Sequence, residues 1–300
     1  GVRSNWVFWQ SQVFASSDDF VSLGDPDEYG MITTYRVRDS QAGNVKFGSL
    51  GYAAAALKSY RTFERLKAAG VIGSDVRFQV SLPTPVAVVA IFVAPEDRAA
   101  VEGPYEIALR RELTEILDQI PPSELAIQWD VAVEFGMLEH AVFDSWWDDP
   151  MAGIIQRLIV LGDAVPDHVA LGYHLCYGDA GHEHFAQPRD ATFLASVAQA
   201  VSDGVSRRIT FIHLPVPRNR SDAEYFSPLA RLNLPAETKL YLGLVHVTDG
   251  VDGATKRLAA ARQFVERFGV ATECGFGRRP PETVAGLLRL HGEVLDAAGA

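Results

Sequence analysis

The sequence predicts an α/β protein that folds as one single-domain (β/α)8 barrel, a TIM barrel, over residues 1–300. Three observations point to it. Apolar, β-branched segments alternate with helix-like segments along the chain, which is typical of a parallel sheet with helical crossovers. The length suits one large barrel, with two small domains as the alternative. Residues able to carry chemistry recur where strands end, and a barrel gathers those ends on one rim. An open doubly wound sheet is the alternative.

The expected strands are short runs rich in valine, isoleucine and leucine. They cover residues 77–82, 125–130, 168–174, 208–213, 239–246 and 269–273. A closed barrel needs two more, and residues 6–9 and 31–37 are weaker candidates. No topology is assigned to the N-terminal part as a whole, residues 1–75.

The expected helices lie between these strands. Leu109, Leu113 and Ile116 recur at spacings of three and four, which indicates one buried helix face. A helix is also expected to start at Pro280-Pro281, because proline suits the first helical turn. Helices are therefore expected over residues 52–69, 105–119, 192–202, 255–268 and 281–290.

Composition excludes some partners. The hydrophobic fraction is 48 % and the charged fraction 22 %, as in ordinary soluble proteins. The formal net charge of -11 argues against nucleic acid as a partner, because an acidic chain repels phosphates. No apolar run reaches the ~20 residues of a membrane helix, and no signal-peptide pattern opens the chain. The two cysteines make no disulfide framework, so the cytoplasm is the expected compartment.

A His-x-Cys pair closes the strand expected at residues 168–174. Side chains two apart on a strand point to the same side, so His174 and Cys176 are expected to face the same way. An imidazole and a thiolate on one face make half of a tetrahedral zinc site. The alternative is a buried cysteine beside a hydrogen-bonded histidine.

Cys274 supplies the third ligand of the predicted metal site. It follows the strand expected at residues 269–273 and precedes a helix, so it is expected on the same rim as Cys176. Catalytic zinc sites use three protein ligands and keep one position open. The sequence therefore predicts zinc held by His174, Cys176 and Cys274.

These motifs resemble a known family. They look like the catalytic half of cobalamin-independent methionine synthase. The motifs that carry the likeness are the strand-terminal His-x-Cys-Tyr, the later Cys-Gly-x-x-x-Arg, the Ile-Gln-x-Asp of residues 127–130, the helix that carries Glu112 and the Pro-Thr-Pro of residues 83–85. The likeness covers residues 77–290, within the methionine synthase and uroporphyrinogen decarboxylase superfamily, and is closest to its short single-barrel members. It implies zinc as cofactor, a small thiol as acceptor, and a methylated folate, a methylated corrinoid protein or a methoxy compound as donor.

The chain departs from that family at several positions. The family places a glutamate ligand at the end of the strand after His-x-Cys, where this chain has His213. His213 is expected to ligate zinc as a neutral imidazole or to contact substrate. The alternative is a histidine that caps the strand end through a backbone hydrogen bond. The family's Asp-Glu-Pro becomes residues 130–132, Asp-Val-Ala, which loses a carboxylate and puts homocysteine in doubt as the thiol. The family's acidic and histidine-bearing sixth-strand rim is replaced by residues 245–249, which include His246.

Further residues are candidates for the reaction itself. His246 and Asp130 are candidate acids for the leaving group. The candidate substrate contacts are His213, Arg218, His182, His184 and Trp146. For the last four the alternatives are a solvated surface position or packing. The expected function is zinc-dependent methyl or alkyl transfer to a thiol. The alternatives are a lyase, decarboxylase or hydrolase acting in the same site, or a binding protein without activity. A homo-oligomer is left open.

Overall fold

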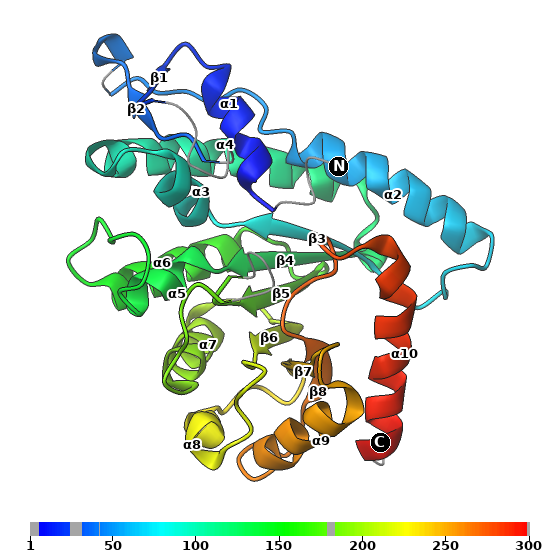
Figure 1. The fold of residues 1–300 in the computed structure, drawn as a ribbon. Helices are drawn as coiled ribbons and strands as arrows, with labels where there is room; N and C mark the ends of the chain where they lie inside the picture. Colours follow the sequence, from blue (N-terminus) through cyan, green and yellow to red (C-terminus); the bar gives the residue numbers. More distant parts are fainter. Residues whose placement is uncertain (1–5, 25–31, 42, 179–183, 299–300) are drawn as a thin grey trace. The chain divides into compact units, whose positions relative to one another are not determined.

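The computed structural model describes residues 6–24, 32–41, 43–178 and 184–298. In these residues six strands form one sheet, ordered as in the sequence, with helices between successive strands (Figure 1). The strands are β3 (Phe78–Pro83), β4 (Leu125–Val131), β5 (Ala170–Leu175), β6 (Phe211–Pro215), β7 (Lys239–Val245) and β8 (Gly269–Thr272). Each overlaps a strand expected from the sequence, so the predicted α/β class is confirmed.

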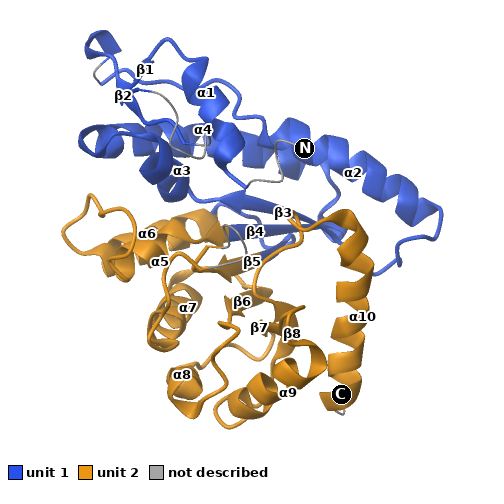
Figure 2. Cartoon of the chain, in the orientation of Figure 1, with its two compact units in different colours: residues 1–129, 164–171 blue, residues 130–163, 172–300 orange. Residues whose placement is uncertain are grey.

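The chain divides into two compact units (Figure 2). Unit 1 comprises residues 1–129 and 164–171, and unit 2 comprises residues 130–163 and 172–300. No helix within the described ranges combines the length and apolar character that crossing a bilayer demands. The three residues expected to bind zinc all belong to unit 2.

The helices of unit 1 include one that periodicity does not reveal. They are α1 (Ser11–Ala15), α2 (Tyr52–Ala68), α3 (Pro85–Phe92) and α4 (Arg98–Gln119). Every residue of α3 is buried, so it has no polar face and its sequence carries no amphipathic signal. Its start is nonetheless marked, because the Thr84 side chain accepts a hydrogen bond from the Ala87 amide at 3.1 Å and Pro85 follows.

The two additional barrel strands predicted in the N-terminal part are wrong for the residues described there. Residues Phe8–Gln10 form a 3-10 helix, and Val7 and Gln10, three apart, are both fully buried. That spacing is helical, whereas a strand would bury alternate residues. In the second segment only Tyr35–Val37 is a strand (β2), and it pairs antiparallel with β1 (Phe20–Ser22) in a separate two-stranded sheet. Residue 31 lies outside the described residues.

A buried carboxylate joins α4 to the start of α2. Glu112 is 5 % exposed, and its Oε1 accepts hydrogen bonds from the Leu50 amide at 2.6 Å and the Ser49 hydroxyl at 2.8 Å. Its Oε2 accepts from the Ala53 amide at 2.7 Å. The first amides of a helix have no partner within the helix, so this carboxylate satisfies donors that burial would otherwise leave unpaired.

The helices of unit 2 follow its strands. They are α5 (Val133–Leu138), α6 (Pro150–Asp163), α7 (Thr192–Gly204), α8 (Ala223–Phe226), α9 (Gly250–Ala261) and α10 (Pro281–Ala298). The helix expected at residues 255–268 begins earlier and ends at Ala261. Asp249, directly before it, accepts two hydrogen bonds from Arg257 inside the helix, at 2.7 and 2.8 Å, which fixes the first turn.

The end of β8 in unit 2 is held close to β7 by a glycine. The strands β5 to β8 are parallel neighbours, and a Cβ at Gly243 of β7 would lie 2.8 Å from the Glu273 Cα and 2.9 Å from the Thr272 carbonyl oxygen. Only glycine permits that approach. On the helical side, Val245, Ala254 and Leu287 belong to one buried cluster, so α9 and α10 pack on β7. This packing positions the segment that carries Cys274.

Candidate functional site

His174 and Cys176 leave β5 on one side, as the alternation predicts. His174 is 5 % exposed and Cys176 is 2 % exposed. The strand is held on its β6 side by the pairing of His174 with His213. Beyond the strand, the Cys176 amide donates to the Val131 carbonyl at 2.7 Å, at the end of β4. Both ligand candidates are therefore fixed by backbone pairing.

Cys274 lies in the turn that follows β8. The Thr272 hydroxyl donates to the Cys274 carbonyl at 2.6 Å and closes that turn. The Arg278 guanidinium lies 3.8 Å from the Cys274 Sγ, in hydrogen-bond contact. The same turn also carries Glu273. The geometry of the turn therefore positions both the Cys274 thiol and the Glu273 carboxylate.

The three predicted ligands meet. One ligand atom each from His174, Cys176 and Cys274 lies within 4.8 Å of the other two. Both cysteines are free thiols rather than a disulfide. Two thiolates and an imidazole form a donor set that zinc favours, and tetrahedral zinc holds its ligand atoms roughly 3.5 to 4 Å apart. Small side-chain rotations would bring the three ligand atoms to the spacing of a tetrahedral zinc site, so the residues fit the metal.

The electrostatics of the cluster favour a thiolate. Hydrogen bonds from Cys176 and from His174 hold the pKa of Cys274 well below its usual range, and the nearby Arg278 adds to that effect, whereas burial opposes it. Metals bind cysteine as the thiolate, so a lowered thiol pKa reduces the cost of losing the proton at neutral pH.

His213 lies directly beside the cluster. Its ring stacks on that of His174, with centroids 4.6 Å apart and planes 20° apart. Its Nε2 donates to the Thr272 carbonyl at 2.9 Å, which is the backbone contact considered as the alternative to a metal role. Burial, and then the neighbouring His174, lower the pKa of His213 to about 3, so the ring is neutral near pH 7. A neutral ring that donates through Nε2 has its lone pair on Nδ1.

His246 belongs to a second buried group. This group also contains Glu273, the residue directly before Cys274. The His246 Nε2 donates to the Val216 carbonyl at 2.9 Å, and its Nδ1 lies 3.4 Å from the Glu273 Oε2. Arg279 donates to the Glu273 Oε1 at 2.8 Å. Burial, and then the charge of Arg257, lower the pKa of His246 to about 4. Sequence reasoning did not assign Glu273 a role, although its position directly before Cys274 offered a signal.

A cavity of about 460 Å³ gathers several of the sequence candidates in unit 2. Its lining includes His184, Arg218 and His246, together with Glu273 and Arg279. The lining residues come from the segments that follow β5, β6, β7 and β8, which is the carboxyl end of the parallel strands.

The remaining candidates lie in different surroundings. Asp130 is half-buried near the end of β4. Trp146 is half-buried against Trp147, with ring centroids 4.6 Å apart. His184 lies with its ring 5.9 Å from that of Tyr177. His182 falls outside the described residues.

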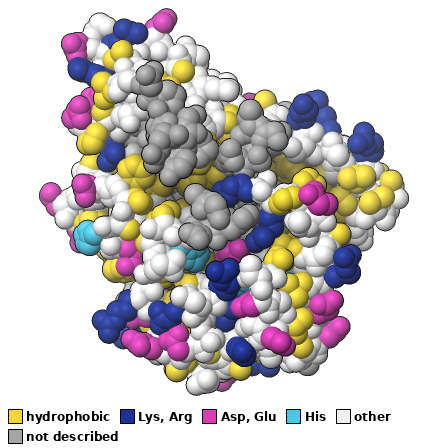
Figure 3. Space-filling model, in the orientation of Figure 1, with side chains coloured by type: hydrophobic (Ala, Val, Ile, Leu, Met, Phe, Trp, Pro, Cys, Tyr) yellow, Lys and Arg dark blue, Asp and Glu magenta, His cyan; other side chains and the backbone are white. Residues whose placement is uncertain are grey.

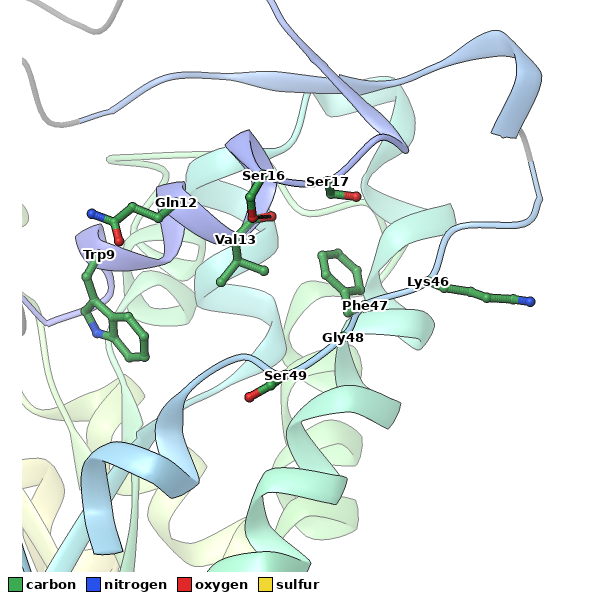
Figure 4. A pocket seen from close by; sticks show the side chains of 9 residues that line it. All are labelled: Trp9, Gln12, Val13, Ser16, Ser17, Lys46, Phe47, Gly48 and Ser49. Carbon is green, nitrogen blue, oxygen red and sulfur yellow. Dashed lines mark hydrogen bonds between the residues drawn. The ribbon is translucent and has the colours of Figure 1, made fainter. Parts of the chain in front are cut away.

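Unit 1 has a cavity of a different kind. It measures about 400 Å³, and nine residues line it, among them Trp9, Ser16, Lys46 and Phe47 (Figure 4). Figure 4 shows the Lys46 side chain extending away from the other labelled side chains. The nine include no histidine, cysteine, aspartate or glutamate, so the lining offers no metal ligand of these types and no acid–base pair.

The structure is similar to solved cobalamin-independent methionine synthases. A B12-independent methionine synthase from Shewanella sp. W3-18-1, in complex with selenomethionine, matches with a TM-score of 0.55 and 14 % identity over 95 % of this chain and 75 % of its own. A putative vitamin-B12-independent methionine synthase from Listeria monocytogenes matches with a TM-score of 0.51 and 12 % identity, over 98 % of this chain and 86 % of its own. No protein-family model and no curated protein matches the sequence. At these identities the likeness establishes the fold.

Proposed function

We propose that this chain catalyses zinc-dependent methyl or alkyl transfer to a small thiol. The observation that carries the proposal is the cluster of His174, Cys176 and Cys274, whose ligand atoms lie within 4.8 Å of one another. The similarity in fold to methionine synthases supports the same reading, because those proteins are named for forming a methylated thiol. The two free cysteines agree with a reducing compartment, and we propose the cytoplasm.

The three residues would hold zinc with one position open to substrate. When bound, zinc supplies a means to keep a thiol deprotonated at neutral pH. In the reaction the thiolate sulfur attacks the methyl carbon in line, the new S–C bond forms, and the donor's bond to that carbon breaks with its electron pair. The protein's part is to align the two partners and exclude water.

The nitrogen of a methylated folate or the oxygen of a methoxy compound needs a proton as it leaves, whereas the cobalt of a methylated corrinoid does not. We propose His246 as the group that supplies it, with Asp130 as the alternative. With a pKa of about 4 the His246 ring is neutral near pH 7. It acts as an acid only after gaining a proton at Nδ1, where the Glu273 carboxylate 3.4 Å away favours the charged form. The backbone contact of Nε2 with Val216 fixes the ring in this orientation.

The substrates are proposed by class. His213, Arg218, His182, His184 and Trp146 are the proposed substrate contacts. The acceptor is a small thiol, and the donor is a methylated folate, a methylated corrinoid protein or a methoxy compound. Residues 130–132 lack the second carboxylate that the family places there, so homocysteine is one thiol among those to test.

The direct test is a turnover screen with zinc-loaded protein. Each donor class carries an isotopically labelled methyl group and is offered with a panel of small thiols. We expect labelled thioether with one pair, and a fall of about 100-fold or more in its rate for His246→Asn, since general acids contribute 10²–10⁴-fold. Thioether formation that is equal in protein with and without zinc would refute the proposal.

His213 gives a second, finer test. We expect His213→Ala to raise KM for the thiol or to lower zinc affinity by about 10-fold, because the ring stacks on His174 and fills the space beside it. His213→Glu is expected to keep the metal and shift the preference among thiols, since it adds a negative charge. Metal content and steady-state kinetics measure both effects. Wild-type values for both in His213→Ala would assign the ring to the Thr272 contact alone.

A further inference from the structure

We propose that the cavity around Arg218 binds a carboxylate group of the substrate, as a monoanion. This rests on the proposed function in one respect: the carboxylate belongs to the thiol acceptor or to the alkyl donor. The cavity itself is defined independently, by the side chains that line it and by their charges.

The cavity is shaped by four segments that follow neighbouring strands. His184 and Gln187 follow β5, and Pro217, Arg218 and Asn219 follow β6. His246 and Thr248 flank Val247 after β7, and Glu273 and Arg279 follow β8. Its volume of about 460 Å³ exceeds that of a carboxylate alone, so part of a larger molecule fits with it.

The charges at the cavity leave one cation without a carboxylate. Arg279 is neutralised by Glu273 at 2.8 Å, with side chains only 13 % and 9 % exposed. The nearby Asp249 forms an ion pair with Arg257. Arg218 is exposed, and among the described residues it forms no ion pair. Its guanidinium donates to the Thr248 hydroxyl through Nη1 at 3.3 Å, and its charge also acts on Asp249. Counted over the residues that the structure describes, the cavity therefore offers one positive charge in excess.

That single charge selects the class of anion. A carboxylate carries one negative charge and matches the planar guanidinium in a two-point contact. A phosphate at neutral pH carries about −1.5 to −2, and the charge beyond the first would have no cation of the described lining left to pair with. Asn219 and Gln187 also line the cavity and offer neutral amide donors. On the face drawn in Figure 3, basic and acidic side chains are interspersed, so recognition depends on local pairing.

The cavity adjoins the candidate metal centre through one turn of chain. Glu273 lines the cavity, and the next residue, Cys274, is a member of the metal cluster. Thr272, one residue earlier, holds His213 through its carbonyl. A carboxylate bound at Arg218 is therefore placed by the same β8 turn that presents Cys274, and it would orient the rest of its molecule relative to that residue.

The test is an NMR titration with butyrate as the probe and butyramide as its neutral isostere. We expect wild-type protein to bind butyrate at millimolar concentration and butyramide at least 10-fold more weakly. Arg218→Gln is expected to weaken butyrate binding about 10-fold, because it removes the charge and the two-point contact. The butyrate affinity of Arg218→Lys is expected to lie between those of wild type and Arg218→Gln. The matched control is Arg289→Gln, an exposed arginine on α10 outside the cavity lining, which is expected to leave binding unchanged.

Two further arms separate this inference from the proposed function and from other anions. The titration is run on zinc-loaded and on chelated protein, so butyrate binding is measured even if no zinc is found. Inorganic phosphate is titrated in parallel. Equal butyrate affinity in wild type and Arg218→Gln, or no binding by wild type, overturns the site. Phosphate binding tighter than butyrate overturns the assignment to a carboxylate.

Discussion

Wild-type protein is expected to carry about one zinc per chain, and Cys274→Ser is expected to lose it. The three ligand atoms of the cluster lie within 4.8 Å of one another, and Cys274 is the thiol whose pKa its neighbours lower. A serine hydroxyl stays protonated at neutral pH and is a poor zinc ligand. Removing one of three protein ligands should therefore weaken zinc by at least about 100-fold.

The measurement is metal analysis of freshly purified protein, followed by competition with a zinc chelator. His174→Asn should behave like Cys274→Ser. His291→Asn is its matched control, because His291 lies on α10 outside the cluster and its Nδ1 contacts the backbone carbonyl of Leu287. Circular dichroism should show that the apo variants stay folded, since the core of unit 2 does not depend on a metal. Wild-type protein that contains no zinc and binds added zinc only weakly would contradict the metal centre.

The largest effect on stability is expected from Glu112→Ala. This change leaves the amides of Leu50 and Ala53, and the Ser49 hydroxyl, without the acceptor that they share in the folded state. Hydrogen bonds to a charged group contribute more than neutral ones, and buried donors left unpaired are costly. We expect the free energy of unfolding to fall by about 3 kcal/mol, with the start of α2 loosened.

Urea denaturation measures this effect, and hydrogen exchange at the first amides of α2 locates it. Glu115→Ala is the matched control, because Glu115 lies on the same helix, α4, and is exposed. It is expected to change stability by less than about 0.5 kcal/mol. Equal midpoints for the two variants would mean that the Glu112 contacts contribute nothing net. An intermediate loss in Glu112→Gln would separate the charge from the loss of the acceptor atoms.

The sequence by itself determined the six parallel strands and the side on which the candidate metal ligands face. Both follow from local rules. A strand alternates its side chains, so His174 and Cys176 share a side wherever the strand goes, and parallel strands end at one edge, which brings Cys274 to them. These conclusions need only the spacing along the chain, and the structure agrees with them.

Only the tertiary structure decided the features that depend on residues far apart. Residues 6–9 are too few to separate a strand from a helical turn, and the buried pair Val7 and Gln10 settled that choice. Helix α3 is buried on every side and so carries no periodic signal. The contacts of Glu112 with residues 49–53 and of Glu273 with His246 join segments distant in sequence. Periodicity reports which face of an element is buried, whereas packing decides which polar partners meet there.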